Sequence, residues 1–117
     1  MALIVQQKRM TPELQKTFDQ VLAQKNKLSD INAQINLRKQ ESDQISADQA
    51  RIRENMKALK GSTEERTLLQ RYTGELNAQE DRLAALRKES SDLQAQKAKA
   101  SDDLDNMIMN INLDEHF

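Results

Sequence analysis

Two long stretches of the chain repeat apolar residues every three or four positions, the spacing that aligns side chains along one stripe of an α-helix. In the second stretch the repeat is a regular heptad, and ten of its thirteen seam positions are apolar or aromatic. These positions are Leu69, Leu76, Leu83, Ser90, Lys97, Leu104 and Ile111 in one series, with Tyr72, Gln79, Leu86, Leu93, Ala100 and Met107 in the other. Such a heptad predicts a helix that pairs with another helix in a coiled coil.

The first stretch carries a similar but less regular repeat. Its predicted seam positions are Leu14, Phe18, Val21, Lys25, Leu28, Ile31, Ile35, Arg38, Ser42, Ile45, Gln49, Ile52, Met56 and Leu59. Around Leu28 two steps of three residues follow each other, from Lys25 and then on to Ile31. This amounts to an insertion of three residues in the heptad and predicts a locally overwound supercoil.

Helix boundaries are marked by capping residues. The Thr-Pro pair at residues 11–12 predicts a helix start, since threonine caps free backbone N–H groups and proline suits the first helical turn. The first helix is expected to end near Lys60, because Gly61 can adopt the left-handed conformation that terminates helices. Ser62 and Glu65 have the spacing of a capping box and predict a second helix within two or three residues.

A break this short folds the second helix back along the first, so the predicted fold is all-α, with two long helices in an antiparallel coiled-coil hairpin. Residues 12–110 form the hairpin with its turn near residues 60–63, preceded by a segment at 1–11 and followed by a tail at 111–117. Dimerisation into a four-helix arrangement is an open alternative, because four apolar residues fall outside the predicted seam: Leu22, Leu37, Leu68 and Ile108.

The register of the hairpin can be predicted from its polar seam residues. If the numbers of facing residues add up to about 128, Gln49 faces Gln79 and apolar residues mostly face apolar ones. A register one heptad away would set Lys25 against Lys97, which is poorer in a core. Polar seam residues lower stability but oppose slipped registers.

Composition restricts the class of protein further. Only 37% of the 117 residues are apolar and 3% are aromatic, whereas 32% are charged, so a compact globular core is not expected. Eighteen basic and nineteen acidic residues give a net charge of −1, and intrinsic disorder is expected in the tails alone. The chain has no cysteine, no signal-peptide pattern in its first residues and no apolar run long enough to cross a bilayer.

The titratable residues do not indicate a catalytic or metal site. His116 is the one histidine and has no cysteine to accompany it, so it is interpreted as a solvated tail residue. Asp102, Asp103 and Asp105 resemble a fragment of a calcium loop, but the glycine and the closing glutamate are missing, and a charged helix face is expected. We therefore predict a non-enzymatic protein without a cofactor.

The two ends of the chain are more apolar than the hairpin requires. A hairpin brings them to the same open end, where one seam cannot bury them all. The predicted interaction residues are Leu3, Ile4, Val5, Met107, Ile108, Ile111 and Phe117. They are interpreted as an attachment surface for a second protomer or for another domain of a larger parent protein, with a small local cluster as the alternative.

One segment resembles a known family. The run of residues 48–59, DQARIRENMKAL, with Tyr72, Leu76 and the QEDRL run at 79–83, resembles the C-terminal coiled coil of uncharacterised bacterial proteins. The resemblance covers about residues 11–113 and implies that a β-rich domain of unknown function precedes the hairpin. It also implies an envelope or exported setting for the parent protein, and it supplies no catalytic residues.

We therefore expect a structural or protein–protein interaction module that acts as a spacer, docking arm or oligomerisation module, with a homodimer or the parent chain as partner. The alternative is an adaptor that binds nucleic acid or a membrane surface through Lys8, Arg9, Lys57 and Lys60. Nucleic acid is the less favoured partner, because the densest basic group is interleaved with the acidic residues Asp48 and Glu54; this group comprises Arg51, Arg53, Lys57 and Lys60. The compartment is not indicated by the sequence.

Overall fold

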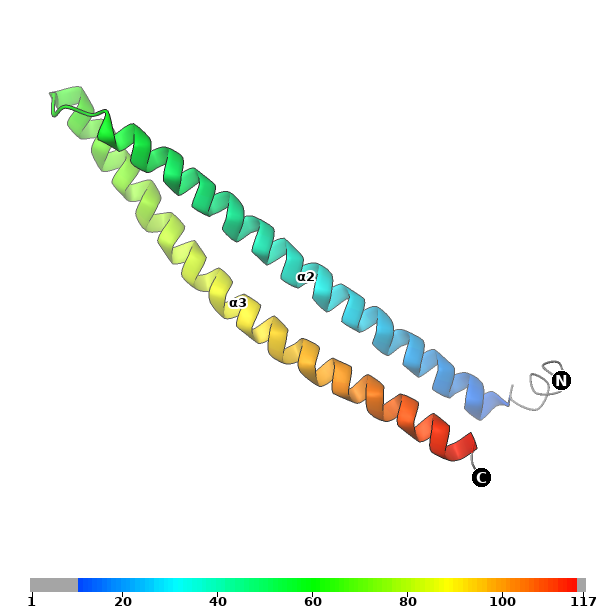
Figure 1. Cartoon of the computed structure of the whole chain (residues 1–117). Coiled ribbons are helices and arrows are strands. Elements are labelled where there is room, and N and C mark those ends of the chain that lie inside the picture. Colours follow the sequence, from blue (N-terminus) through cyan, green and yellow to red (C-terminus); the bar gives the residue numbers. More distant parts are fainter. Residues whose placement is uncertain (1–10, 116–117) are drawn as a thin grey trace. The chain divides into compact units, whose positions relative to one another are not determined.

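The computed structural model describes residues 11–115, and the side chains of residues 11–111. Within this range the chain forms two α-helices and no strand: α2, Pro12–Lys57, and α3, Thr63–Glu115. The helices run in opposite directions and are joined by a short turn (Figure 1). The predicted all-α helical hairpin is therefore confirmed, although α3 extends beyond residue 110 into the segment that was expected to be a tail.

The start of α2 is capped as predicted. The Thr11 hydroxyl accepts a hydrogen bond from the backbone N–H of Leu14 at 3.1 Å, and Pro12 occupies the first helical position. The end of α2 lies at Lys57 rather than near Lys60. There the N–H of Ala58 donates to the carbonyl of Asn55 at 3.2 Å, an i to i−3 bond that tightens the last turn.

The turn is closed by one carboxylate. Glu65 accepts hydrogen bonds from the backbone N–H groups of Lys60 at 2.7 Å and Ser62 at 3.1 Å, and the Ser62 hydroxyl accepts one from the N–H of Glu65 at 3.2 Å. This reciprocal pair is the predicted capping box. Gly61 has a φ of +93°, which confirms the left-handed conformation expected of it. The N–H group of Lys60, with help from Ser62, lowers the pKa of Glu65.

The chain divides into two compact units, each containing a segment of both helices. The turn unit comprises Gln34–Leu93. The open-end unit comprises Met1–Ala33 and Gln94–Phe117, of which residues 11–33 and 94–115 are described.

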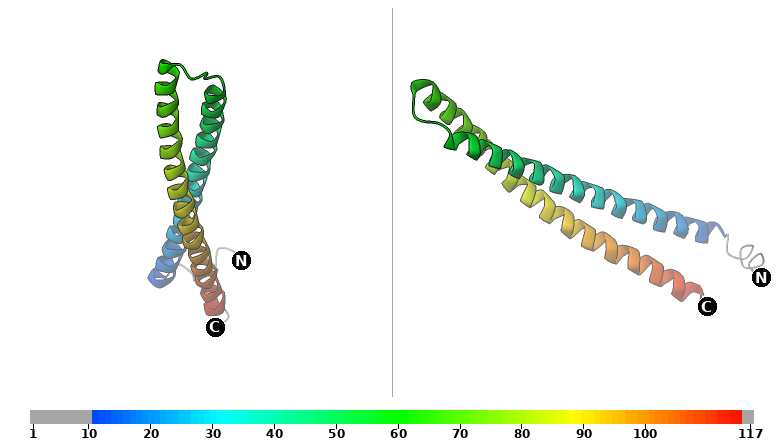
Figure 2. Two further views of the ribbon diagram at one scale, coloured as in Figure 1. Left: turned by 90° about the vertical axis from the view of Figure 1, so that its left-hand side faces the viewer. Right: turned by 45° about the horizontal axis from the view of Figure 1, so that its top comes forward.

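In the turn unit, the segments of α2 and α3 that the turn connects lie next to each other (Figure 2). Ile52 and Leu86 are completely buried between them. One prediction fails near the turn: Leu69 is 39% exposed, whereas Leu68 is half-buried. Glu65 is held by the turn, and Leu68 lies three residues after it on the same face, so the cap sets the phase of the first turns of α3.

Three hydrogen bonds between the helices of the turn unit match the predicted register. They join side chains on or beside the seam: Gln79 to Asp48 at 2.6 Å, Gln49 to Glu80 at 2.9 Å, and Arg38 to Glu89 at 3.3 Å. In each pair the residue numbers add up to within one of 128. The register one heptad away is therefore wrong for this unit.

In the open-end unit the seam of α2 differs from the prediction. Phe18 is 42% exposed and Lys25 is exposed, while Thr17 and Gln24 are half-buried. The seam of α2 therefore keeps alternating steps of three and four residues, and the predicted insertion before Ile31 is wrong. The seam can contain the polar Gln24 because its side-chain amide donates a hydrogen bond to the backbone carbonyl of Ala100 at 2.9 Å. The half-buried amide N–H group therefore has an acceptor, as buried donors require.

Candidate interaction surface

The apolar residues predicted to form an attachment surface differ in their exposure to solvent. Met107 and Ile111 are half-buried in the seam of the open-end unit, whereas Ile108 is 39% exposed. The remaining predicted residues, Leu3, Ile4, Val5 and Phe117, lie outside the described part of the chain. Ile108 is thus the one described member of the predicted set that presents a large exposed area.

Two residues of α2 join Ile108 on one side of the open-end unit. In an antiparallel coiled coil the positions that directly follow the d residues, called e, line one side of the seam on both helices. Thr17 and Met107 are d residues, because each lies three positions after the seam residue that precedes it. Phe18 and Ile108 directly follow them and therefore occupy e positions. Leu22, which is 58% exposed, lies one helical turn from Phe18 on the same side. We call Phe18, Leu22 and Ile108 the open-end face.

The open-end face was only partly predictable from the sequence. Leu22 and Ile108 were expected to lie outside the seam, and both are exposed. The apolar repeat alone predicts a seam position for Phe18, because Phe18 is apolar and Thr17 is not. The signal that would have located it is the heptad itself, since steps of four and three counted back from Leu28 lead to Gln24, Val21 and Thr17. Met109 is also exposed, at 59%. It lies two residues after Met107, on the outer surface of α3 opposite the seam, and so does not belong to the open-end face.

The opposite side of the seam is occupied by ion pairs in the turn unit. Arg82 donates to Glu41 on α2 at 2.9 Å and to Glu89 at 3.1 Å, and Glu89 also pairs with Arg38 at 3.3 Å. Arg82, Glu41 and Glu89 lie at g positions, which border the seam on the side away from the e positions. The Arg82 guanidinium lowers the pKa of Glu41, and this hydrogen bond in turn raises the pKa of Arg82. This side of the turn unit is therefore engaged in contacts within the chain.

The seam of the turn unit also contains a polar layer. Gln49, which is 5% exposed, donates to Glu80, and Gln79 donates to Asp48. The side-chain oxygen Oε1 of Gln79 is buried and finds no donor among the described residues. Asp48 also accepts from Arg51 at 2.9 Å, and this bond, followed by that from Gln79, lowers the pKa of Asp48. The layer joins the two helices but leaves one acceptor unsatisfied.

The basic group considered for nucleic acid is partly neutralised. Arg51 pairs with Asp48 at 2.9 Å and Lys57 pairs with Glu54 at 2.9 Å. Arg53 is exposed. Two of the cations in this group thus have carboxylate partners within the same helix.

The acidic group on α3 lies within a helix. Asp102, Asp103 and Asp105 are all helical, and Asp103 pairs with Lys99 at 3.3 Å. Across the described residues, no three histidine, cysteine or acidic side chains are grouped in a way that suits a metal ion. Neither helix, over its described length, has a window that is both long and apolar enough to span a membrane.

No protein-family model, curated protein or solved structure matches the chain. Functional inference consequently depends on the surface itself.

Proposed function

We propose that this chain is a non-enzymatic interaction module, a helical hairpin that serves as a docking arm, spacer or oligomerisation module of a larger protein. The observation that carries this proposal is the open-end face. Phe18, Leu22 and Ile108 are 42%, 58% and 39% exposed, come from both helices and lie on one side of a single unit. A group of large apolar side chains exposed together is typical of a protein–protein contact.

The seam supports this reading, because it satisfies its own residues without the open-end face. Ile31 and Ala100 are already buried in the open-end unit, at 5% and 2% exposure. Burying Phe18 and Leu22 as well would require atoms from outside the described hairpin. The resemblance to the hairpin of uncharacterised bacterial proteins would make this hairpin part of a larger parent chain, in which such a contact could serve as a docking surface.

The proposed function is tested by photo-cross-linking in cells of the source organism. A photoreactive amino acid replaces Leu22 on the open-end face, and the matched control replaces Gln40, an exposed residue of α2 in the turn unit. We expect cross-links to protein from position 22 and few from position 40, with the cross-linked peptides identified by mass spectrometry. Equal labelling from both positions would refute a docking role for this face, and cross-links to nucleic acid or lipid would favour the adaptor alternative.

A further inference from the structure

We propose that the partner bound by the open-end face is a second copy of this chain, placed parallel to the first and related to it by a two-fold axis along the helices. This inference rests on the proposed function and names its partner. It follows from the order of apolar and charged residues along the helix axis on the e side of the open-end unit. We call a position along this axis a level, so that two residues facing each other across the seam share one level.

The levels are set by the heptad. The seam of α2 is unbroken through both units, so Val21 faces the level of Met107 and Gln24 the level of Leu104. The bond from Gln24 to the carbonyl of Ala100 agrees with this, because helix carbonyls point toward the residue four positions on. Ile108 then lies at a level between Phe18 and Leu22.

This order makes the open-end face complementary to itself. When two copies are stacked in parallel through their e sides, α2 of each copy lies over α3 of the other. Ile108 of each copy then enters the gap between Phe18 and Leu22 of the other. The same contact forms twice, as an isologous two-fold interface requires. Insertion of one side chain between residues of a facing helix resembles the knobs-into-holes packing of coiled coils, in which four residues form each hole.

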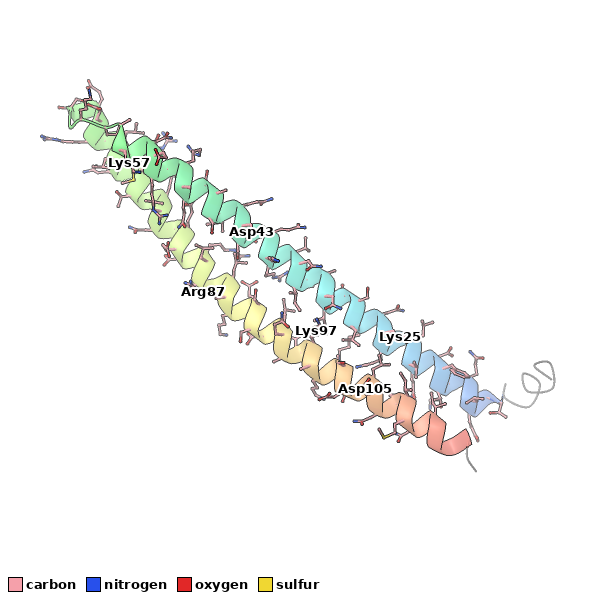
Figure 3. All side chains as sticks on the ribbon, viewed as in Figure 1. Lys25, Asp43, Lys57, Arg87, Lys97 and Asp105 are labelled. Atoms are coloured by element: carbon pink, nitrogen blue, oxygen red, sulfur yellow. The ribbon has the colours of Figure 1, made fainter. Side chains whose placement is uncertain are left out.

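Charge selects the same arrangement. Lys25 occupies the next e position after Phe18, and Asp105 lies one turn before Ile108 on the same side of α3. Lys25 belongs to α2 and Asp105 to α3 (Figure 3). Both are exposed, and neither forms an ion pair with another described residue. In the parallel pair, Lys25 of each copy faces Asp105 of the other. An antiparallel pair would instead place Lys25 near Gln15 of the second copy, and it would leave both charges without a partner.

The experiment measures the mass of the full chain by sedimentation equilibrium over a wide range of concentrations. We expect the mass to rise from 13.4 kDa toward twice that value. Ile108→Glu should keep the mass at the monomer value, whereas Leu37→Glu, which changes a leucine of the turn unit that is 53% exposed, should leave dimerisation unchanged. Circular dichroism verifies that each variant remains helical.

A charge exchange tests the orientation. Lys25→Asp alone and Asp105→Lys alone each place like charges together twice in the dimer, and each should weaken dimerisation about 5- to 100-fold. Mixing these two variants should restore a dimer that contains one copy of each, because both contacts then pair opposite charges. A mixture that stays monomeric while the unchanged chain dimerises would overturn the parallel arrangement.

The outcomes separate this inference from the proposed function. A wild-type mass that stays at 13.4 kDa, or a dimer that survives Ile108→Glu, refutes the second copy as partner. Cross-links from position 22 to a different protein would then still support a docking role. If position 22 cross-links to another copy of the chain, both proposals are supported.

Discussion

Replacing Gln79 by leucine is expected to stabilise the turn unit. The Oε1 atom of Gln79 is buried without a donor among the described residues, and its amide nitrogen makes one hydrogen bond, to Asp48. A buried acceptor without a partner costs about 1–3 kcal/mol, whereas a typical hydrogen bond contributes about 0.5–1.5 kcal/mol. Leucine removes the unsatisfied oxygen and adds apolar area to the seam.

The free energy of unfolding should therefore increase by about 1 kcal/mol or slightly more, which corresponds to a rise of roughly 4–8 °C in the unfolding midpoint of a domain of this size. The matched control is Gln49→Leu. Gln49 is 5% exposed and donates to Glu80, and neither of its polar atoms is left buried without a partner. The control loses a hydrogen bond without relieving an unsatisfied atom, so Gln79→Leu should be the more stabilising change.

The assay is chemical and thermal unfolding followed by far-ultraviolet circular dichroism. Both variants are compared in an Ile108→Glu background, so that any change in self-association does not alter the apparent stability. If Gln79→Leu lowers the free energy of unfolding, or stabilises less than Gln49→Leu does, the unsatisfied oxygen is not the dominant energetic feature of the polar layer.

Two further predictions concern the seam and the ion pairs. Ile52 is completely buried and Leu69 is 39% exposed, so Ile52→Ala should lower the free energy of unfolding by about 2–5 kcal/mol and Leu69→Ala by much less, as measured by urea denaturation; similar losses would show that Leu69 belongs to the core after all. The folded pKa values of Glu41 and Glu65 lie below their usual value of 4.5, so both carboxylates stabilise the fold above that pH and lose this contribution as the pH falls through their folded pKa values. The unfolding midpoint should accordingly decrease on acidification below about pH 5, and Glu41→Gln should flatten that decrease; an unchanged pH profile would argue against the Arg82 contact.

The sequence predicted α3 better than α2, for a physical reason. The heptad of α3 contains large apolar residues at most seam positions, so the buried stripe is visible in the sequence. In the first part of α2 the seam contains Thr17 and Gln24, while the more apolar Phe18 lies beside it. Apolar character alone therefore gave the wrong phase. A long helix keeps its phase because distorting the supercoil would disturb every following layer, whereas Gln24 needs a single hydrogen bond, which Ala100 accepts.

The turn shows a similar division. Gly61 and the capping box were identified from residue types and spacing, because these motifs are local. The early end of α2 at Lys57 and the burial of Leu68 in place of Leu69 were not. Both depend on the Glu65 carboxylate, which reaches back to the N–H of Lys60 and thereby links the end of one helix to the phase of the next. The open-end face was missed at Phe18 for the same reason that the seam was.

The position of the turn also has a kinetic consequence. The interhelical bond between Asn55 and Tyr72 spans 17 residues of sequence, whereas that between Gln24 and Ala100 spans 76. Since the entropy lost in closing a loop rises with its length, contacts near Gly61 form at the lowest entropic cost. We therefore expect the two helices to pair first at the turn and then progressively toward the open end. The residues of the open-end face come from both helices and lie farther from the turn than the Gln24–Ala100 bond. This face is therefore complete only when the two helices are paired along their whole length, and a partner that binds it would bind only fully folded chains.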